Sequence, residues 1–255
     1  MIGQLTMTHS VVTSNATVRH SEGIASWVGR LAPLVIFLTS LLLLLMTIAP
    51  TFYFLDSAEL AIGAATLGIV HAPGYPLYLM VAHLFTYLPI GDIGYRVNLM
   101  SALCLAGTAT LLFMTLSMLL KNRAVAASTT FIFTFSYYIW ATGVVAEVYA
   151  PQLFTIALCT YLLVHLAQNP RQRQRTMLWL GCAIGLAVAA HPSSALLLPG
   201  VVLACLTFGI GLRLNILAGM LSILVFASTL LYFPIRFAAE PALNLAGEYR
   251  ADGSF

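Results

Sequence analysis

The chain has 255 residues, of which 60% are hydrophobic and 7% are charged, against roughly 25% charged residues in an ordinary soluble domain. Apolar runs of about 20 residues recur along the whole chain, so the sequence predicts an all-α, polytopic integral membrane protein and excludes a soluble domain. The net charge of +3 is spread over loops and does not indicate a nucleic-acid partner. The four cysteines lie singly in apolar segments, which supports neither a disulfide framework nor a zinc site.

The first apolar run, Leu31–Phe54, follows a polar N-terminus over residues 1–30. The run is too long for a signal-peptide core and no small-residue cleavage site follows it, so we predict an uncleaved first span. Two carboxylates, Asp56 and Glu59, come directly after it in a chain with only eight acidic residues. A carboxylate near the bilayer is costly and is a functional candidate by default.

Two short apolar segments come next, separated by the turn His71-Ala72-Pro73-Gly74-Tyr75-Pro76. The second, Tyr75–Ile90, is shorter than the roughly 17–25 residues that a spanning helix needs. If it crossed, every later basic cluster would lie on the wrong side of the membrane. We therefore predict that Ser57–Ile69 and Tyr75–Leu88 form two helices lying on, or dipping into, the outer leaflet. The alternative is one extra span that breaks the charge rule.

The longer apolar runs that follow are Val97–Leu120, Ala124–Gly143, Tyr149–Ala167, Met177–Ala190, Ala195–Leu212 and Leu214–Phe233. Basic residues cluster between them, at Arg19/Arg30, Lys121/Arg123, Arg171/Arg173/Arg175 and Arg213. The positive-inside rule places these clusters in the cytoplasm. We thus expect a multi-span domain over residues 31–236 of the inner (plasma) membrane, with a cytoplasmic N-terminus and an outer polar tail over residues 237–255.

This topology brings ionisable residues from separate stretches to the outer face: Asp56, Glu59, His71, Arg96, Glu147, His191 and Arg236. Ionisable residues are rare at membrane depth, so their gathering at one level predicts a site at the outer water–lipid boundary. Each also has a simpler interpretation. Asp56 and Glu59 have the spacing of a capping box, His71 begins a rigid Pro-Gly-Pro turn, and Glu147 and His191 flank helices. Arg96 and Arg236 are placed like interfacial anchors that snorkel to lipid headgroups.

Five stretches, in this order and spacing, carry a family resemblance: Asp56-Ser57-Ala58-Glu59-Leu60, His71-Ala72-Pro73-Gly74-Tyr75-Pro76-Leu77, Arg96-Val97-Asn98-Leu99-Met100-Ser101-Ala102-Leu103, Ala146-Glu147-Val148-Tyr149 and Tyr232-Phe233-Pro234-Ile235-Arg236. The region from about Leu31 to Arg236 resembles the membrane-embedded glycosyltransferases of the GT-C fold. It is most similar to the bacterial domain-of-unknown-function family related to the animal O-mannosyltransferase of IPT domains (transmembrane protein 260-like). Ala72 departs from a frequent second proline, and Ala190 precedes His191 where an asparagine is more usual.

The resemblance implies an inverting transfer of a mannose-like sugar from a polyprenyl-phosphate donor to an acceptor hydroxyl of a protein or glycan on the outer face. It implies no metal or other cofactor, and a GT-C-like helix bundle with outer juxtamembrane helices of which this chain is the N-terminal part. The two catalytic carboxylates are then Asp56, as the base, and Glu59. The substrate-binding residues are His71, Tyr75, Arg96, Glu147, His191 and Arg236, with the arginines on the donor phosphate.

Two other classes of protein also gather charges in a membrane. A secondary transporter places them near the midplane at broken helices, usually with inverted repeats, and no internal repeat is visible in this sequence. A non-catalytic protein that binds polyprenyl lipid would want outer-leaflet cations but would not need Asp56. Replacing Asp56 by asparagine therefore separates that class from an enzyme.

Overall fold

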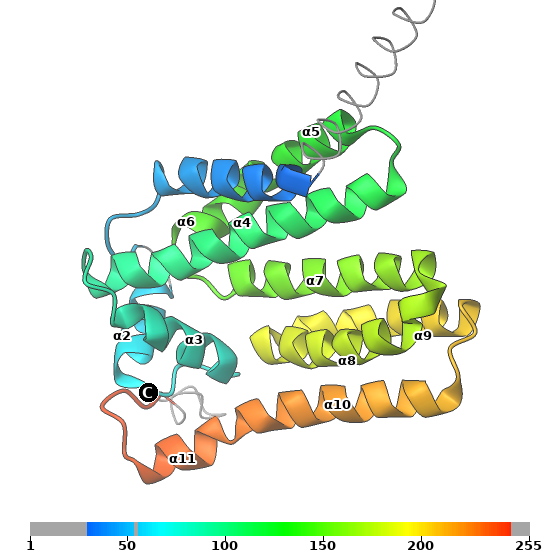
Figure 1. The fold of residues 1–255 in the computed structure, drawn as a ribbon. Coiled ribbons are helices and arrows are strands. Elements are labelled where there is room, and N and C mark those ends of the chain that lie inside the picture. The colour runs from blue at the N-terminus through cyan, green and yellow to red at the C-terminus, as the bar shows by residue number, and fades with distance from the viewer. Residues whose placement is uncertain (1–29, 54–55, 246–255) are drawn as a thin grey trace, which may run out of the picture.

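The computed structural model describes residues 30–53 and 56–245 and shows a bundle of long helices with two short helices at one end (Figure 1). The elements in chain order are helix Arg30–Leu45, α2 (Ser57–Thr66), α3 (Pro76–Thr86), α4 (Ile93–Leu119), α5 (Arg123–Thr134), α6 (Tyr137–Val144), α7 (Tyr149–Gln168), 3-10 helix η1 (Pro170–Gln172), α8 (Arg173–Ala190), 3-10 helix η2 (Pro192–Leu197), α9 (Leu198–Thr207), α10 (Leu212–Leu230) and α11 (Tyr232–Ala238). Strand pairing among the described residues is limited to one isolated bridge between Ile69 and Asn244. The predicted all-α, polytopic class is confirmed.

Three of the described helices are long and apolar enough to cross a membrane: α4, α7 and the continuous stretch Leu212–Ala238. Helices α5 and α6 together make a fourth candidate, but they are bent by 70° at their junction. The run Ala124–Gly143, predicted as a span, is thus divided between two helices that together pass for one bent span. The break has a local cause, because the Ser136 hydroxyl donates to the Phe133 carbonyl at 2.7 Å and the Ser136 backbone is extended.

The first described helix ends at Leu45, well before Phe54, the end of the predicted run, which lies outside the described residues. Pro50 has no amide hydrogen to continue the helix. The chain instead runs across the bundle, where the Ala49 amide donates to the Val144 carbonyl at 2.9 Å. The buried Asn98 amide of α4 donates to the Ala49 and Thr51 carbonyls, both at 2.9 Å. This strap delivers the chain to the start of α2.

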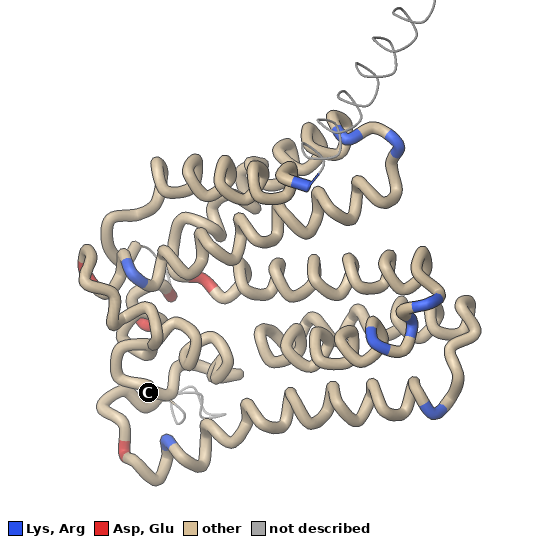
Figure 2. The backbone as a smooth tube through the Cα atoms, in the orientation of Figure 1, with Lys and Arg blue, Asp and Glu red and all other residues tan. Residues whose placement is uncertain are grey.

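Charge is separated along the bundle. Figure 2 shows most Lys and Arg residues at one end and the Asp and Glu residues at the other. The basic end holds the α4–α5 connection with Lys121, the α7–α8 connection with Arg171, and the start of α10 with Arg213. The basic clusters that the predicted topology places on one side of the membrane thus lie at one end of the bundle, and the cytoplasmic location of that end stays a prediction from the positive-inside rule. Residues 1–29 and 246–255 lie outside the description.

The two short helices predicted after the first span are present as α2 and α3, at the acidic end of the bundle (Figure 1). They have 10 and 11 residues, which is about 15–17 Å of helix against a hydrocarbon core of about 30 Å. They pack on each other and on α4, with Leu60, Tyr78, Leu79 and Val97 fully or almost fully buried between them. Neither helix is long enough to cross the membrane.

We therefore expect the two ends of α3 to lie on the same side of the membrane. Single cysteines at Ala72 and Ile90, both exposed, should react with an impermeant thiol reagent from the same side. A cysteine at the exposed Arg171 should react from the opposite side. The measurement needs a background in which the four natural cysteines are replaced. Labelling of Ala72→Cys and Ile90→Cys from opposite sides would make α3 a span and overturn the topology.

Candidate functional site

Six of the eight site residues predicted from the sequence come together at the acidic end of the bundle: Asp56, Glu59, His71, Tyr75, Glu147 and His191. They come from the start of α2, the turn before α3, the loop between α6 and α7, and the end of α8. Side chains far apart in the sequence thus meet because the helix ends meet. Arg96 and Arg236 lie elsewhere at this end, with contacts of their own.

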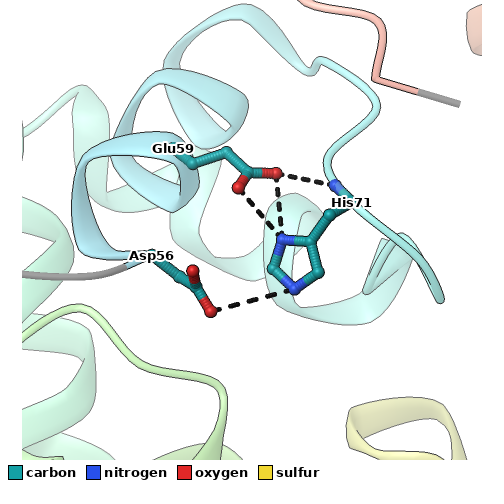
Figure 3. A network of polar contacts seen from close by, with 3 residues as sticks. All are labelled: Asp56, Glu59 and His71. Carbon is teal, nitrogen blue, oxygen red and sulfur yellow. Dashed lines mark hydrogen bonds and ion pairs between the residues drawn. The ribbon is translucent and has the colours of Figure 1, made fainter. Parts of the chain in front are cut away.

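The centre of the site is a chain of three side chains in which His71 lies between two carboxylates (Figure 3). Glu59 accepts a hydrogen bond from the His71 backbone amide at 2.6 Å, and its two oxygens lie 3.1 and 3.0 Å from the His71 ring Nδ1. The other ring nitrogen, Nε2, lies 3.8 Å from Asp56 Oδ2. Because a carboxylate only accepts hydrogen bonds, Nδ1 carries the proton and Nε2 faces Asp56.

His71 and Asp56 are separated by a gap that no direct hydrogen bond closes. A separation of 3.8 Å is too long for a direct hydrogen bond, and a polar atom can bridge such a gap. The Asp56 side chain is 53% exposed, whereas the Glu59 and His71 side chains are 23% and 22% exposed. Glu59 therefore holds His71 from the protein side, while the Asp56 carboxylate remains accessible to solvent.

The capping-box interpretation of Asp56 and Glu59 is not what the contacts show. Asp56 occupies the N-cap position of α2, but its side chain makes no capping hydrogen bond, and its backbone is already helical. Glu59 binds His71 instead of reaching back to the helix start. The Ser57 hydroxyl accepts the hydrogen bond of the Tyr53 amide at 2.6 Å. The Asp56 carboxylate thus does not cap the start of α2.

Stacked rings connect the turn before α3 to the ends of α7 and α8. The ring of Tyr75 meets His71 edge-on at 5.5 Å and stacks on His191 at 5.9 Å, and His191 lies 5.7 Å from Tyr149. Tyr75 is 8% exposed and has a left-handed backbone, with φ 41°, which costs a non-glycine residue about 1–2 kcal/mol. The ring contacts with His71 and His191 hold Tyr75 in this conformation.

The charges of the site act on one another. Burial, with added repulsion from Asp56, raises the pKa of Glu147. Burial also raises the pKa of Tyr75, as do Tyr149, Asp56, Glu147 and Glu59, so Tyr75 remains a hydroxyl donor. The pKa of His191 is lowered by burial, which favours its neutral ring. Glu147 therefore binds its proton more tightly than an ordinary glutamate does.

The raised pKa of Glu147 predicts a pH-dependent gain from Glu147→Gln. A carboxyl whose folded pKa lies above its ordinary value of 4.5 loses stability on ionising, because ionisation is easier in the unfolded chain. The penalty is absent below the ordinary pKa and fully present above the raised one. We expect Glu147→Gln to melt higher than the parent protein at pH 7–8 and at the same temperature near pH 4. Equal melting temperatures at both pH values would contradict the buried, repelled position of Glu147.

The two arginines cap the C-terminal ends of the short helices. Arg96 donates to the carbonyls of Thr86, Ile90 and Gly91 through three different nitrogens at 2.7–3.0 Å. Arg236 of α11 donates to the Leu67 and Thr66 carbonyls at 2.6 and 3.1 Å, and Tyr232 donates to the Gly68 carbonyl at 2.5 Å. A guanidinium has five N–H donors, so each arginine keeps donors for a phosphate.

We expect Arg96→Lys and Arg236→Lys each to weaken donor binding by about tenfold, the scale of one charge-assisted hydrogen bond. Lysine keeps the charge but loses the planar fork that can hold helix carbonyls and a phosphate together. The measurement is donor affinity beside the melting temperature, with Arg213→Lys at the basic end as the control. A lower melting temperature with unchanged donor affinity would assign these arginines to helix capping alone.

Some residues of the site were not found by sequence reasoning. Tyr149 completes the ring stack, and Gln152 donates to the Ser193 hydroxyl at 2.7 Å. Ser193 in turn lies 2.8 Å from His191 Nδ1. Tyr149 and Gln152 follow Glu147 in the first turn of α7, and this closeness to a predicted site residue could have identified them. Nothing in the sequence except its closeness to His191 indicated that Ser193 belongs to the site.

The same three central residues are also the one group in the described part of the chain with the composition and spacing of a metal site. One ligand atom from each of Asp56, Glu59 and His71 lies within 4.8 Å of the others. The contacts between Glu59 and His71 already satisfy most of these atoms. In this structure Glu59 and His71 are hydrogen-bonded to each other, with Asp56 Oδ2 at 3.8 Å from the other ring nitrogen.

Comparison with known proteins agrees with this geometry. The family model of the protein O-mannosyl-transferase TMEM260 N-terminal domain matches residues 56–213. The chain belongs to this family. The match begins at Asp56 and contains the whole ring stack.

Two curated relatives share part of the TMEM260 family sequence. The protein O-mannosyl-transferase TMEM260 of Mus musculus is 35% identical over 122 residues, which are 48% of this chain and 17% of that protein. The tmem260 protein of Dictyostelium discoideum, with the same description, is 24% identical over 169 residues, 59% of this chain and 20% of that protein. The chain thus spans about a fifth of the length of these relatives. No solved structure matches it.

Proposed function

We propose that this protein is an inverting glycosyltransferase that moves a sugar from a polyprenyl-phosphate donor to an acceptor hydroxyl at the outer face of the membrane. The names of the two TMEM260 relatives support mannose as the sugar and a protein as the acceptor. A sugar on a lipid phosphate is already activated. The enzyme has to deprotonate the acceptor and stabilise the leaving phosphate.

The single observation that carries the proposal is the exposed Asp56 carboxylate facing His71 Nε2 across 3.8 Å. An acceptor hydroxyl in this gap donates its proton to Asp56. Its oxygen attacks the anomeric carbon of the sugar, and the bond from that carbon to the phosphate oxygen breaks. The polyprenyl phosphate leaves with the electron pair. The reaction therefore inverts the anomeric centre.

The remaining residues have supporting roles. Glu59 orients His71, and Tyr75, whose ring contacts His71, is the proposed hydroxyl donor to the substrate. Arg96 and Arg236 lie at the same end of the bundle, where a polyprenyl phosphate places its charge, and they are the proposed phosphate ligands. Membrane lipids surround the long helices, and the proposed partners are the lipid-linked donor and a protein or glycan acceptor.

The test is transfer of labelled mannose from polyprenyl-phosphate mannose in membranes with and without this chain. The chain is to be expressed with all of the coding sequence that surrounds it. Expected is chain-dependent labelling of a protease-sensitive product. Movement of free sugar across sealed vesicles, with no covalent product, would favour a transporter. Donor binding without transfer would favour a non-catalytic lipid-binding protein.

Chelation belongs in the same assay. Transfer that survives EDTA agrees with the relay of Asp56, His71 and Glu59. Loss of transfer that Mn²⁺ or Mg²⁺ restores would assign the three residues to a metal ion instead. Either result leaves the transferase proposal itself standing.

A further inference from the structure

A cavity of about 750 Å³ lies beside the proposed base, between the strap after helix Arg30–Leu45, the broken helix α6 and the start of α7. Its size is within the range of about 300–1,000 Å³ of ligand pockets. Aromatic side chains dominate its walls: Tyr53, Tyr137, Trp140 and Tyr149. Trp140 is fixed in place, because its indole N–H donates to the Thr47 hydroxyl at 3.0 Å.

The polar groups that line the cavity indicate which class of ligand it can bind. Among the described residues that line it, Glu147 is the charged one and none is a Lys or Arg. A phosphate would meet a carboxylate with no cation to balance the charge. A neutral ligand with hydroxyl groups suits the carboxylate as an acceptor, and the flat aromatic rings suit the apolar C–H faces of a sugar ring. The lining is therefore that of a sugar pocket.

Two residues that line the cavity, Glu147 and Tyr149, also interact with the group of residues around Asp56 and His71. Glu147 is near enough to Asp56 and His71 for both to act on its charge. Tyr149 lines the cavity and also stacks with His191 in the ring stack around Tyr75. A ring seated between Trp140 and Glu147 would thus have its reacting carbon toward Asp56.

The direction from which the cavity can be reached indicates whether the lipid-linked donor or the protein acceptor binds there. The cavity wall formed by α6 belongs to a broken span, whose Tyr137 and Tyr138 are 71% and 83% exposed toward the surroundings of the bundle. Leu42, on the helix before the strap, is 60% exposed in the same way. A lipid-linked substrate arrives through such an apolar surface, whereas a protein acceptor arrives from water at the exposed Asp56.

We propose that this cavity binds the sugar ring of the lipid-linked donor, with Glu147 accepting hydrogen bonds from its hydroxyls and Trp140 against its face. This proposal rests on the transferase function proposed above. It goes further by naming the donor sugar site and the residues that select for a neutral sugar. The phosphate then lies outside the cavity, away from Glu147.

Trp140 provides a direct probe of donor binding. The chain has three tryptophans, so replacement of Trp27 and Trp179 by phenylalanine in the full chain leaves Trp140 as the fluorophore. Polyprenyl-phosphate mannose is expected to change the Trp140 emission saturably, and polyprenyl phosphate without sugar is expected to bind at least tenfold more weakly by this signal. Glu147→Gln should weaken the response to the mannose donor by about tenfold. Tyr138→Phe, next to the cavity but outside its lining, should change nothing.

The outcomes separate this site from the function on which it rests. If polyprenyl phosphate without sugar changes the Trp140 emission equally, the cavity binds the isoprenoid chain, and the proposal is overturned. No Trp140 response in a protein that transfers mannose would place the donor sugar elsewhere and leave the transferase function intact. No response and no transfer would overturn both. Weaker binding in Glu147→Gln with unchanged binding in Tyr138→Phe supports the proposal.

Discussion

Replacing Asp56 by asparagine is expected to lower sugar transfer by roughly 10²–10⁴-fold, the usual contribution of a general base. Asparagine has the size of aspartate and also suits the N-cap position. The Asp56 side chain makes no capping bond and is 53% exposed, so the fold should not depend on it. The measurements are transfer rate, melting temperature and the amount of protein in the membrane.

A matched control for Asp56→Asn is Glu240→Gln, which removes another exposed carboxylate, two residues after the end of α11. This variant should transfer at the parental rate. Near-normal turnover in Asp56→Asn, together with a large loss in Glu147→Gln, would move the base to Glu147. Loss of membrane-inserted protein in Asp56→Asn would assign Asp56 a structural role instead.

The fold class followed directly from the sequence because a bilayer imposes simple rules. The length of apolar runs and the place of basic residues predicted the long helices, and the short length of Tyr75–Ile90 predicted that α3 would not span. Breaks within the runs were harder to see. At the break between α5 and α6, Ser136 has an extended backbone and its hydroxyl donates to the Phe133 carbonyl, and hydropathy averages over such local effects.

The site was predictable as a group of residues but not as a set of contacts. Asp56, Glu59 and His71 were expected at one level of the membrane, and the structure joins them through His71. Their roles depend on which atom faces which, and this follows from the turn geometry at Tyr75. The arginines show the same limit, since Arg96 and Arg236 are at the expected end but turn toward helix carbonyls.

The second large effect is expected at His71, which we regard as a positioning residue acting through Asp56. His71→Ala removes the ring between the carboxylates and leaves Asp56 and Glu59 to repel each other. Transfer should fall by about 10²-fold, with most of the loss in kcat, because the acceptor hydroxyl is no longer aligned with the base. The measurement is kcat and KM for the acceptor in the full chain.

Two substitutions distinguish the two ring nitrogens of His71. Asparagine places a polar group near the position of Nδ1 and can still bind Glu59, which approaches Nδ1 at 3.0 Å. Glutamine reaches toward the position of Nε2, on the side of Asp56. If His71 positions Asp56 and the acceptor, His71→Gln should retain more transfer than His71→Asn at equal melting temperature.

Rescue by added imidazole gives a readout that a purely structural role would not move. The His71 side chain is 22% exposed, so a small ring has a path to the hole left in His71→Ala. Imidazole should restore part of the lost kcat there and none in Asp56→Asn, because the carboxylate that accepts the proton is absent from the latter. Equal transfer by His71→Ala and the parent protein would remove His71 from the reaction. Asp56 would then act on the acceptor without a partner, and the 3.8 Å gap between the two side chains would have no role in transfer.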